Sequence, residues 1–416
     1  MIKSGCEIMD SSKSTEVELS KNNILQYIKN LISTFIEDKA KNLIKIQKRN
    51  SNTKMNLIKT YAIIAVVCSH CNGGGVVFPM ENWISPFFYF MPIFVFVSGY
   101  FYKKENDDAN LFIFIIQKIK KLLVPYFLWN VFYGILNNIF RKIGVIKYGD
   151  PIDFHSLFIR PWIDGHQFHF NIAAWFLLSL FLVTITTYLL RRIMKLIKIL
   201  NEEFLLLITF VVSVVSIYYA QKGYNTGWYL CLAKFCFLLP YYQLGFLYKK
   251  YEKYFNKHNF AMICIMTCGI YMLLELSKGE ASLGVVYAVF NGNPLILTGL
   301  EVLAILMTAT VFEILSPAFE KSKIVKTIGE NTFTIMMHHP IIIFLMNLIL
   351  YIMTGFIVIA SFDIQEFQST LWYVCPWRDS RIYIFYVAFS VAIPLIIKLI
   401  CNNIIIKTNN SLKNKE

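Results

Sequence analysis

The sequence predicts an all-α integral membrane protein, a bundle of about ten transmembrane helices. Hydrophobic residues make up 56% of the 416 residues and charged residues only 16%, whereas soluble domains average about 25% charged residues. Apolar runs of about 20 residues recur along the chain, and an α-helix needs this length to cross a bilayer. Lysines and arginines gather in alternate loops between these runs, as the orientation of membrane helices requires.

The hydrophobic part accounts for most of the chain. Residues 1–21 are polar, which predicts a disordered N-terminus without a cleavable signal peptide. In residues 22–54 apolar side chains recur at helical spacing opposite lysines, a pattern typical of an amphipathic helix on the cytoplasmic membrane surface. The membrane domain is expected over 55–402, followed by a basic cytoplasmic tail at 403–416. Within that domain we expect spans near 57–75, 84–102, 122–140, 171–190, 203–220, 229–248, 259–277, 294–316, 332–354 and 380–401.

The distribution of positive charge predicts the orientation. If the N-terminus is cytoplasmic, most lysines and arginines fall in the inward loops and the C-terminal tail, as the positive-inside rule requires. Both termini are therefore expected in the cytoplasm, with the protein in the cytoplasmic membrane. The net charge of +14 is explained by this orientation, and no aromatic-laced basic patch indicates a nucleic-acid partner.

The first predicted span carries the pair of residues on which the functional interpretation depends. Lys59 and His70 are eleven residues apart in the run Asn56–Asn72, which places them on one helix face, about 16 Å apart along the axis. Ionisable groups in hydrocarbon are costly, so they mark functional sites by default. A snorkelling lysine and a histidine bonded to a neighbouring helix are the structural alternative.

Cysteine and histidine patterns do not predict a metal site. Cys68 and Cys71 form a CxxC around His70, but zinc sites of this kind need a second pair of ligands. His166 and His169 form an HxxH in an outward loop, and no third ligand has suitable spacing. We therefore expect no metal.

Further basic and histidine side chains are candidates for a site. Lys118 and Lys121 precede the third span, where lysines bind anionic lipid headgroups or clamp a phosphorylated ligand; the sequence leaves both alternatives open. Lys234 lies within the sixth span and should face the interior or a wet cavity. His338 and His339 point about 100° apart on the ninth span, so at most one should share a cavity with the first-span histidine. The residues that we consider as lining of a site are Ser98, Trp175, Lys234 and His339.

Six segments in the expected order resemble the acyltransferase-3 family of integral membrane O-acyltransferases, over roughly residues 55–400. The most specific is a basic residue, ten further residues and a histidine in the first span, matched here by Lys59 and His70. The basic run before the third span is similar to the family's RxxR motif. The supporting segments are IFVFVSGYF in the second span, KIKKLLVPY at 118–126, AWFLLSL at 174–180, LPYYQLGFL at 239–247 and IGENTFTIMMHHP at 328–340.

The resemblance implies transfer of an acyl group, usually acetyl, from cytoplasmic acyl-CoA to a hydroxyl of a cell-surface glycan or a lipid-linked sugar. Lys59, Lys118 and Lys121 would hold the nucleotide phosphates, and His70 would be the general base. An extended pantetheine arm is of the order of the 16 Å between Lys59 and His70. An acyl-histidine intermediate is the variant that the sequence leaves open. Lysine replaces the family's commoner arginine at all three basic positions, which loses the bidentate fork.

The sequence leaves two other functions open. A polysaccharide or small-molecule exporter fits ten spans with intramembrane lysines, although no internal repeat is present. A membrane scaffold or sensor is the other, and the oligomeric state is not predicted. Aromatic residues in the outward loops offer faces for a sugar acceptor, and such residues are also typical of membrane interfaces. They are Trp83, Phe154, Trp162, Phe168, Trp372 and Trp377.

Overall fold

The computed structural model describes most of the chain in two compact units. One unit is Asn52–Leu395, and the other combines Met1–Ser51 with Ile396–Glu416. The described residues are 33–34, 36–41, 43, 52–78, 81, 84–165, 168–359, 361–376 and 382–413.

The smaller unit is helical wherever the structure describes it. The residues described between 33 and 43 are helical, and Lys41 pairs with Glu37 one turn earlier at 2.8 Å. The second half of α15 (Tyr383–Lys413) also belongs to this unit. The N-terminal segment expected at 1–21, and most of the amphipathic helix expected at 22–54, lie outside the described residues.

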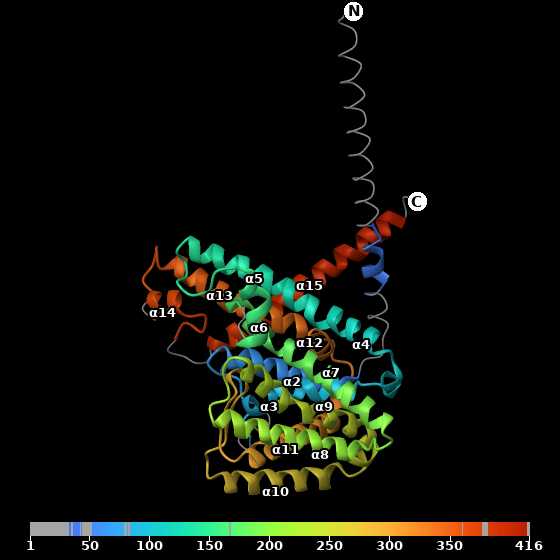
Figure 1. The fold of residues 1–416 in the computed structure, drawn as a ribbon. Helices are drawn as coiled ribbons and strands as arrows, with labels where there is room; N and C mark the ends of the chain where they lie inside the picture. The colour runs from blue at the N-terminus through green and yellow to red at the C-terminus, as the bar shows by residue number, and fades with distance from the viewer. Residues whose placement is uncertain are drawn as a thin grey trace, which may run out of the picture. The chain divides into compact units, whose positions relative to one another are not determined.

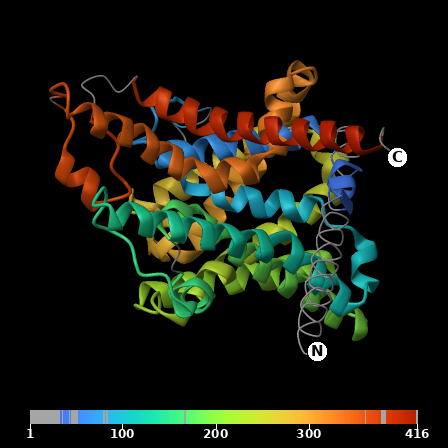
Figure 2. The same cartoon turned by 90° about the horizontal axis from the view of Figure 1, so that it is seen from above.

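The larger unit is a bundle of helices that run side by side along one common direction (Figures 1 and 2). One short antiparallel hairpin pairs β1 (Ser282–Gly284) with β2 (Val289–Asn291). The longer helices are α2 (Thr53–Ser69), α3 (Pro86–Tyr100), α5 (Val124–Lys142), α7 (Trp175–Leu196), α8 (Glu202–Gln221), α9 (Trp228–Lys257), α10 (Asn259–Ser277), α11 (Pro294–Leu315), α13 (Thr332–Met353) and the first half of α15. The short helices are α4 (Leu111–Lys118), α6 (Arg160–Ile163), α12 (Lys323–Glu330) and α14 (Ile364–Ser369), with 3-10 turns η1 (Lys104–Asp108), η4 (His169–Ala174), η5 (Val285–Tyr287) and η6 (Ser316–Phe319), and π turns η2 (Ile119–Leu123) and η3 (His155–Ile159).

The described residues include seven helices that are long and apolar enough to cross a membrane. They are α7 with η4, α8, α9, α10, α11 with η6, α13 and α15. Each of the ten expected spans overlaps one helix of the structure, but α2, α3 and α5 are not among the seven. The structure therefore supports an all-α membrane bundle, and the number of ten spans stays a prediction.

Helix α2 ends earlier than the span expected at 57–75. The side chain of Asn52 caps its start by accepting the N–H of Met55 at 2.9 Å, and the helix ends at Ser69 with His70 as its C-cap. Three glycines at 73–75 follow, all with positive φ, a conformation that glycine adopts without steric cost. The chain therefore turns directly after His70, and this histidine lies at the end of the helix and not within it.

Two glycines bring α3 and α9 into backbone contact. A Cβ on Gly99 would lie 1.8 Å from the carbonyl oxygen of Tyr242, and a Cβ on Gly245 would lie 1.9 Å from that of Phe96. No other residue fits at such distances, and small residues are what allow membrane helices to approach this closely. The glycines of the SGY and QLGF segments are thus explained by packing.

Residues 111–142 form one continuous helix with a π turn inside it. Helices α4 and α5 are joined without a break by η2, where the N–H of Val124 bonds to the carbonyl of Ile119. Pro125 accounts for this turn, because a proline ring clashes with the carbonyl four residues earlier, here that of Lys121. The wider π turn relieves the clash and sets the direction of the segment that carries this lysine.

A buried lysine holds the first turn of α2. Lys54 is 4% exposed and pairs with Glu252 of α9 and, at 2.8 Å, with Glu313 of α11. Its ammonium also lies 4.9 Å from the ring centroid of Tyr248. These contacts hold the N-terminal end of α2 against α9 and α11. His70 lies at the other end of this helix.

Candidate active site

Two histidines from different helices meet at the end of α2. The Nδ1 of His70 lies 2.8 Å from the Nε2 of His339, which belongs to α13 and is fully buried. The ring centroids are 5.0 Å apart and the ring planes 17° from parallel, so at this N–N distance the rings lie edge to edge in nearly one plane. The Nδ1 of His339 lies 3.0 Å from the carbonyl oxygen of Ile335, one turn earlier in α13.

The adjacent histidine of α13 faces another helix. The Nδ1 of His338 lies 2.5 Å from the hydroxyl oxygen of Tyr133 on α5, and its ring meets Trp129 edge-on with centroids 4.4 Å apart. Of the two neighbouring histidines, His339 is therefore the one that the fold brings to His70.

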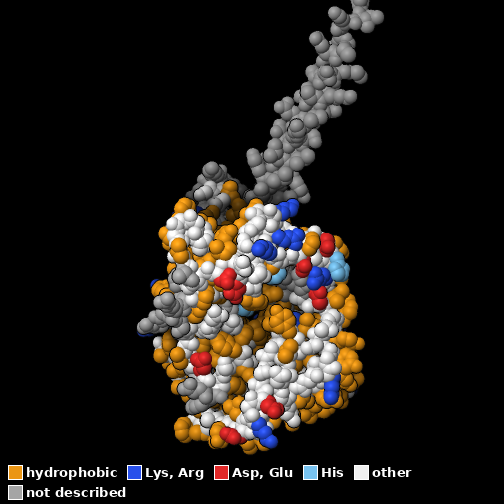
Figure 3. Space-filling view, turned by 90° about the vertical axis from the view of Figure 1, so that its left-hand side faces the viewer, with side chains coloured by type: hydrophobic (Ala, Val, Ile, Leu, Met, Phe, Trp, Pro, Cys, Tyr) orange, Lys and Arg blue, Asp and Glu red, His pale blue; other side chains and the backbone are white. Residues whose placement is uncertain are grey.

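An aromatic ring covers the exposed side of this pair. The ring of Trp372 lies on His70 with centroids 5.1 Å apart and planes 28° from parallel. Trp372 follows α14 in the chain and is 45% exposed. Figure 3 views the side of the unit on which α14 lies in Figure 1, where hydrophobic side chains cover much of the surface. The imidazole pair thus lies beneath a face that is expected to point outward.

Three of the predicted site residues line one pocket of about 320 Å³. Lys59 of α2, Ser98 of α3 and Lys121 of η2 contribute its polar groups. Helices α7 and α13 close the pocket, and most of its wall is apolar. The remaining lining residues are Ile63, Phe94, Val97, Leu122, Pro125, Phe176, Leu177, Leu180, Thr332, Phe333 and Met336.

The helices that line this pocket also carry the histidine pair. On α13, Met336 lines the pocket and precedes His339 by three residues, which is about 4.5 Å of helix rise. On α2, Ile63 lines the pocket and precedes His70 by seven residues, or about 10 Å. Lys59 therefore lies at one level of α2, and the imidazoles lie at a further level along the same axis.

Comparison with known proteins identifies the family of the chain. The family model Acyl_transf_3, described as an acyltransferase domain, matches residues 52–399, which cover the site and nearly all of the bundle. The chain belongs to the acyltransferase-3 family. It is therefore a multi-pass membrane acyltransferase. No curated protein and no solved structure matches it significantly.

The first lysine of the RxxR-like pair does not line the pocket of this acyltransferase. The ammonium of Lys118 lies 4.9 Å from the ring centroid of Phe114, one turn earlier in α4. Lys118 precedes the third predicted span, where burial and the neighbouring charge of Lys121 lower its pKa to about 8. Lys118 is thus one helical turn outside the pocket that Lys121 enters.

Two further predicted residues of the acyltransferase pair with each other. The ammonium of Lys234 on α9 lies 4.9 Å from the ring centroid of Trp175 at the start of α7, and Lys234 is 4% exposed. A Cβ on Gly165 would lie 2.8 Å from this ammonium. Neither Lys234 nor Trp175 lines the lysine pocket, although Phe176 next to Trp175 does.

The hydroxyl of Ser98 is committed to the backbone. It donates to the carbonyl oxygen of Phe94 at 2.8 Å, the usual bond of a serine inside a helix. Its hydrogen is therefore engaged, and only its oxygen is presented to the pocket. This bond argues against Ser98 as a donor to a developing oxyanion.

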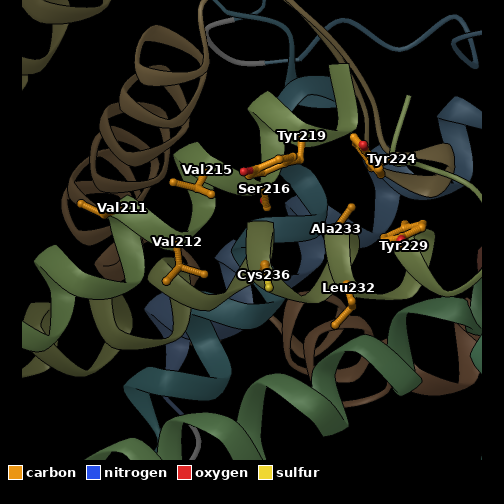
Figure 4. A pocket seen from close by; sticks show the side chains of 10 residues that line it. All are labelled: Val211, Val212, Val215, Ser216, Tyr219, Tyr224, Tyr229, Leu232, Ala233 and Cys236. Atoms are coloured by element: carbon orange, nitrogen blue, oxygen red, sulfur yellow. The ribbon is translucent and has the colours of Figure 1, made fainter. Parts of the chain in front are cut away.

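A second pocket, of about 530 Å³, lies between α8 and α9 (Figure 4). Its wall is mainly aliphatic with three tyrosines, Tyr219, Tyr224 and Tyr229, and it contains none of the predicted site residues. The part of the chain that the structure describes has no group of three His, Cys, Asp or Glu side chains suited to a metal ion; His166 of the HxxH lies outside that part.

Sequence reasoning missed two features of the acyltransferase site. The carbonyl of Ile335 is a backbone group, and no residue type marks which carbonyl a histidine will meet. Lys54 looks like an ordinary charge at the start of an apolar run, yet it anchors the site helix. The one clue to this anchoring role in the sequence is the position of Lys54. It lies five residues before Lys59, at the start of the same helix.

Proposed function

We propose that this acyltransferase is an O-acyltransferase of the cytoplasmic membrane. It moves an acyl group, in the simplest case acetyl, from cytoplasmic acyl-CoA to a hydroxyl of a cell-surface glycan or of a lipid-linked sugar precursor. The observation that carries the proposal is the lysine-lined pocket, whose helices α2 and α13 continue to the paired imidazoles of His70 and His339.

The pocket suits the donor in charge and in length. Lys59 and Lys121 supply two cations for the phosphates of coenzyme A, each acting as a point charge. The apolar wall suits the pantetheine arm, which is uncharged and extended. Its length is of the order of the 16 Å that separates Lys59 from His70 along α2. Neither His70 nor His339 lines the pocket, so the proposal requires the thioester to pass from the pocket along α2 to the imidazole.

His70 carries the chemistry in this proposal. Its imidazole removes the proton of the acceptor hydroxyl while the hydroxyl oxygen attacks the thioester carbonyl. The tetrahedral intermediate then expels the thiolate of coenzyme A, which takes the proton back from His70. The acyl ester and free coenzyme A are the products, and the enzyme returns to its initial protonation state.

The position of His70 at the end of α2 favours this proton transfer. The C-terminus of a helix carries a partial negative charge, and a cation there is stabilised by about 0.3–1 kcal/mol. His70 is the C-cap of α2, so the imidazolium that forms during the reaction meets this partial charge.

In the alternative mechanism through an acyl-histidine intermediate, the donor would transfer its acyl group to the protein without any acceptor. Incubation with labelled acetyl-CoA in the absence of acceptor would reveal this labelled intermediate.

Trp372 supports a sugar as the acceptor. Its ring contacts His70 and is 45% exposed on the face expected to point outward. Indole rings bind the apolar faces of sugars through the same large flat surface that makes them strong anchors elsewhere. Because one face of the indole lies on His70, a sugar would bind at its edge or its free face, close to the outer side of the imidazole.

Binding of acetyl-CoA to the purified protein tests the proposal. We expect Lys121→Ala to weaken binding about tenfold, because one charge-assisted phosphate contact contributes about 1.5–3 kcal/mol. The matched control is Lys120→Ala, since Lys120 is the adjacent exposed lysine and does not line the pocket; its affinity should stay within twofold of wild type. Absence of acetyl-CoA binding, or equal effects of both substitutions, would contradict the proposal and favour an exporter.

A further inference from the structure

We infer that His339 is a positioning residue that fixes the tautomer of His70 and thereby selects which of its two nitrogens takes the proton. This inference rests on the proposed function, because it concerns the same imidazole. It follows from two hydrogen bonds in series, from the Nδ1 of His70 to the Nε2 of His339 and from the Nδ1 of His339 to the carbonyl oxygen of Ile335.

The backbone determines the tautomer of His339. A carbonyl oxygen only accepts hydrogen bonds, so the Nδ1 that lies 3.0 Å from the carbonyl of Ile335 must carry the hydrogen. The Nε2 of a neutral imidazole protonated at Nδ1 has a lone pair and no hydrogen. His339 is fully buried, and the neutral ring is the form that burial favours. His339 therefore presents an acceptor to its neighbour.

This acceptor determines the tautomer of His70. Its Nδ1 lies 2.8 Å from the Nε2 of His339 and in nearly the same plane, so it must carry the hydrogen and donate it. The opposite tautomer would place two lone pairs against each other at that distance. The Nε2 of His70 is consequently the nitrogen with the free lone pair, and it is the atom that acts on the acceptor hydroxyl.

The same bond stabilises the charged state of the reaction. When the Nε2 of His70 accepts the proton of the hydroxyl, the bond from its Nδ1 to His339 becomes charge-assisted and stronger. No proton moves to His339, whose own hydrogen stays on its Nδ1 and is donated to the carbonyl oxygen of Ile335. After the Nε2 returns its proton to the thiolate, both rings are as before. His339 thus takes the place that a carboxylate holds in serine hydrolases, without a buried negative charge.

Substitutions at position 339 separate this role from packing. In His339→Gln the amide oxygen can accept from His70 and the amide nitrogen can donate to Ile335, so this variant should retain most activity. His339→Met keeps similar volume and offers no strong acceptor. We expect it to lower kcat about 100-fold, the scale of losing a correctly held base, with the KM for acetyl-CoA within twofold of wild type. His338→Gln, which changes the neighbouring ring bonded to Tyr133, should leave kcat unchanged.

The decisive readout is the tautomer itself. ¹⁵N NMR of histidine-labelled protein in detergent, with the signal assigned by its loss in His70→Ala, should show His70 protonated at Nδ1 in wild type and in His339→Gln, and a mixture of tautomers in His339→Met. Protonation at Nε2 in wild type, or equal kcat for His339→Met and wild type, would overturn the inference. If His70 shows the expected tautomer but His70→Ala retains acyl transfer, the proposed function fails while the assignment of the tautomer stands.

Discussion

One basic side chain near the donor pocket loses its charge more easily than an ordinary lysine. Lys118 lies one turn outside the pocket, where burial and the nearby Lys121 lower its pKa to about 8. A lysine of ordinary pKa stays charged throughout the physiological range, whereas Lys118 is half neutral near pH 8. If the donor phosphates extend from the pocket to Lys118, one turn away, their binding there is sensitive to pH.

This property predicts a pH dependence of donor binding. The phosphates bind the charged form, which predominates below about pH 8 and is lost as the pH rises through this value. The KM for acetyl-CoA should therefore rise between pH 7 and pH 9, and binding near pH 8 should take up protons, which calorimetry in buffers of different ionisation enthalpy measures. In Lys118→Gln both effects should be smaller. An identical pH dependence in this variant would exclude Lys118 from donor binding.

At the scale of helices, the close packing of α3 against α9 holds one wall of the pocket in position. The contacts at Gly99 and Gly245 are made with backbone carbonyl groups, which cannot rotate away as a side chain can. Helix α3 carries Ser98 next to one of these glycines, so a displacement of α3 would move the pocket wall as well.

Gly99→Ala should therefore destabilise the protein. The added Cβ would lie 1.8 Å from the carbonyl oxygen of Tyr242, and overpacking of this kind costs about 1–3 kcal/mol or more in the free energy of unfolding. Gly299→Ala is the control, because its Cβ would meet only the flexible end of Leu273 at 3.2 Å and alanine favours a helix by about 1 kcal/mol. Thermal unfolding in detergent should show a lower Tm for Gly99→Ala alone. Equal Tm values for the two variants would contradict the close contact of α3 and α9.

The helices were the most predictable part of this protein. Apolar runs follow from the thickness of the bilayer, a constraint that acts on each segment by itself, so α10 at Asn259–Ser277 has the bounds expected for the seventh span. The end of α2 was not predicted, because Ser69, His70 and Cys71, which follow the apolar run, do not by themselves stop a helix. The glycines at 73–75 were the signal available, and their positive φ explains the turn.

The placement of site residues within each helix was predictable from the sequence, but the contacts between helices were not. Helical spacing placed Lys59 and His70 on one face and allowed only one of His338 and His339 to approach His70. Which of the two does so depends on the rotation of α13 against α2, and one sequence carries no pattern for that rotation. The pairing of Lys54 with acids of α9 and α11 was beyond reach for the same reason.

At the scale of the whole molecule, the proposed donor and acceptor approach the site from different sides of the membrane. Lys59 and Lys121 line the pocket at the end expected to face the cytoplasm, and Trp372 and His70 lie toward the opposite face. The bundle between them would let donor and acceptor approach the same imidazole from opposite sides of the membrane. The positive charge of the inward loops predicts that the end with Lys59 and Lys121 faces the cytoplasm.

Transfer of labelled acetyl groups in oriented membrane vesicles tests this approach from two sides most directly. Radiolabelled acetyl-CoA should acetylate the glycan or lipid-linked sugar fraction when it is supplied on the cytoplasmic side, and not when it is supplied only on the other side. The protein with His70→Ala should insert normally and lose at least about 100-fold of this activity. Transfer that is independent of the side of supply, or that persists in His70→Ala, would contradict the account.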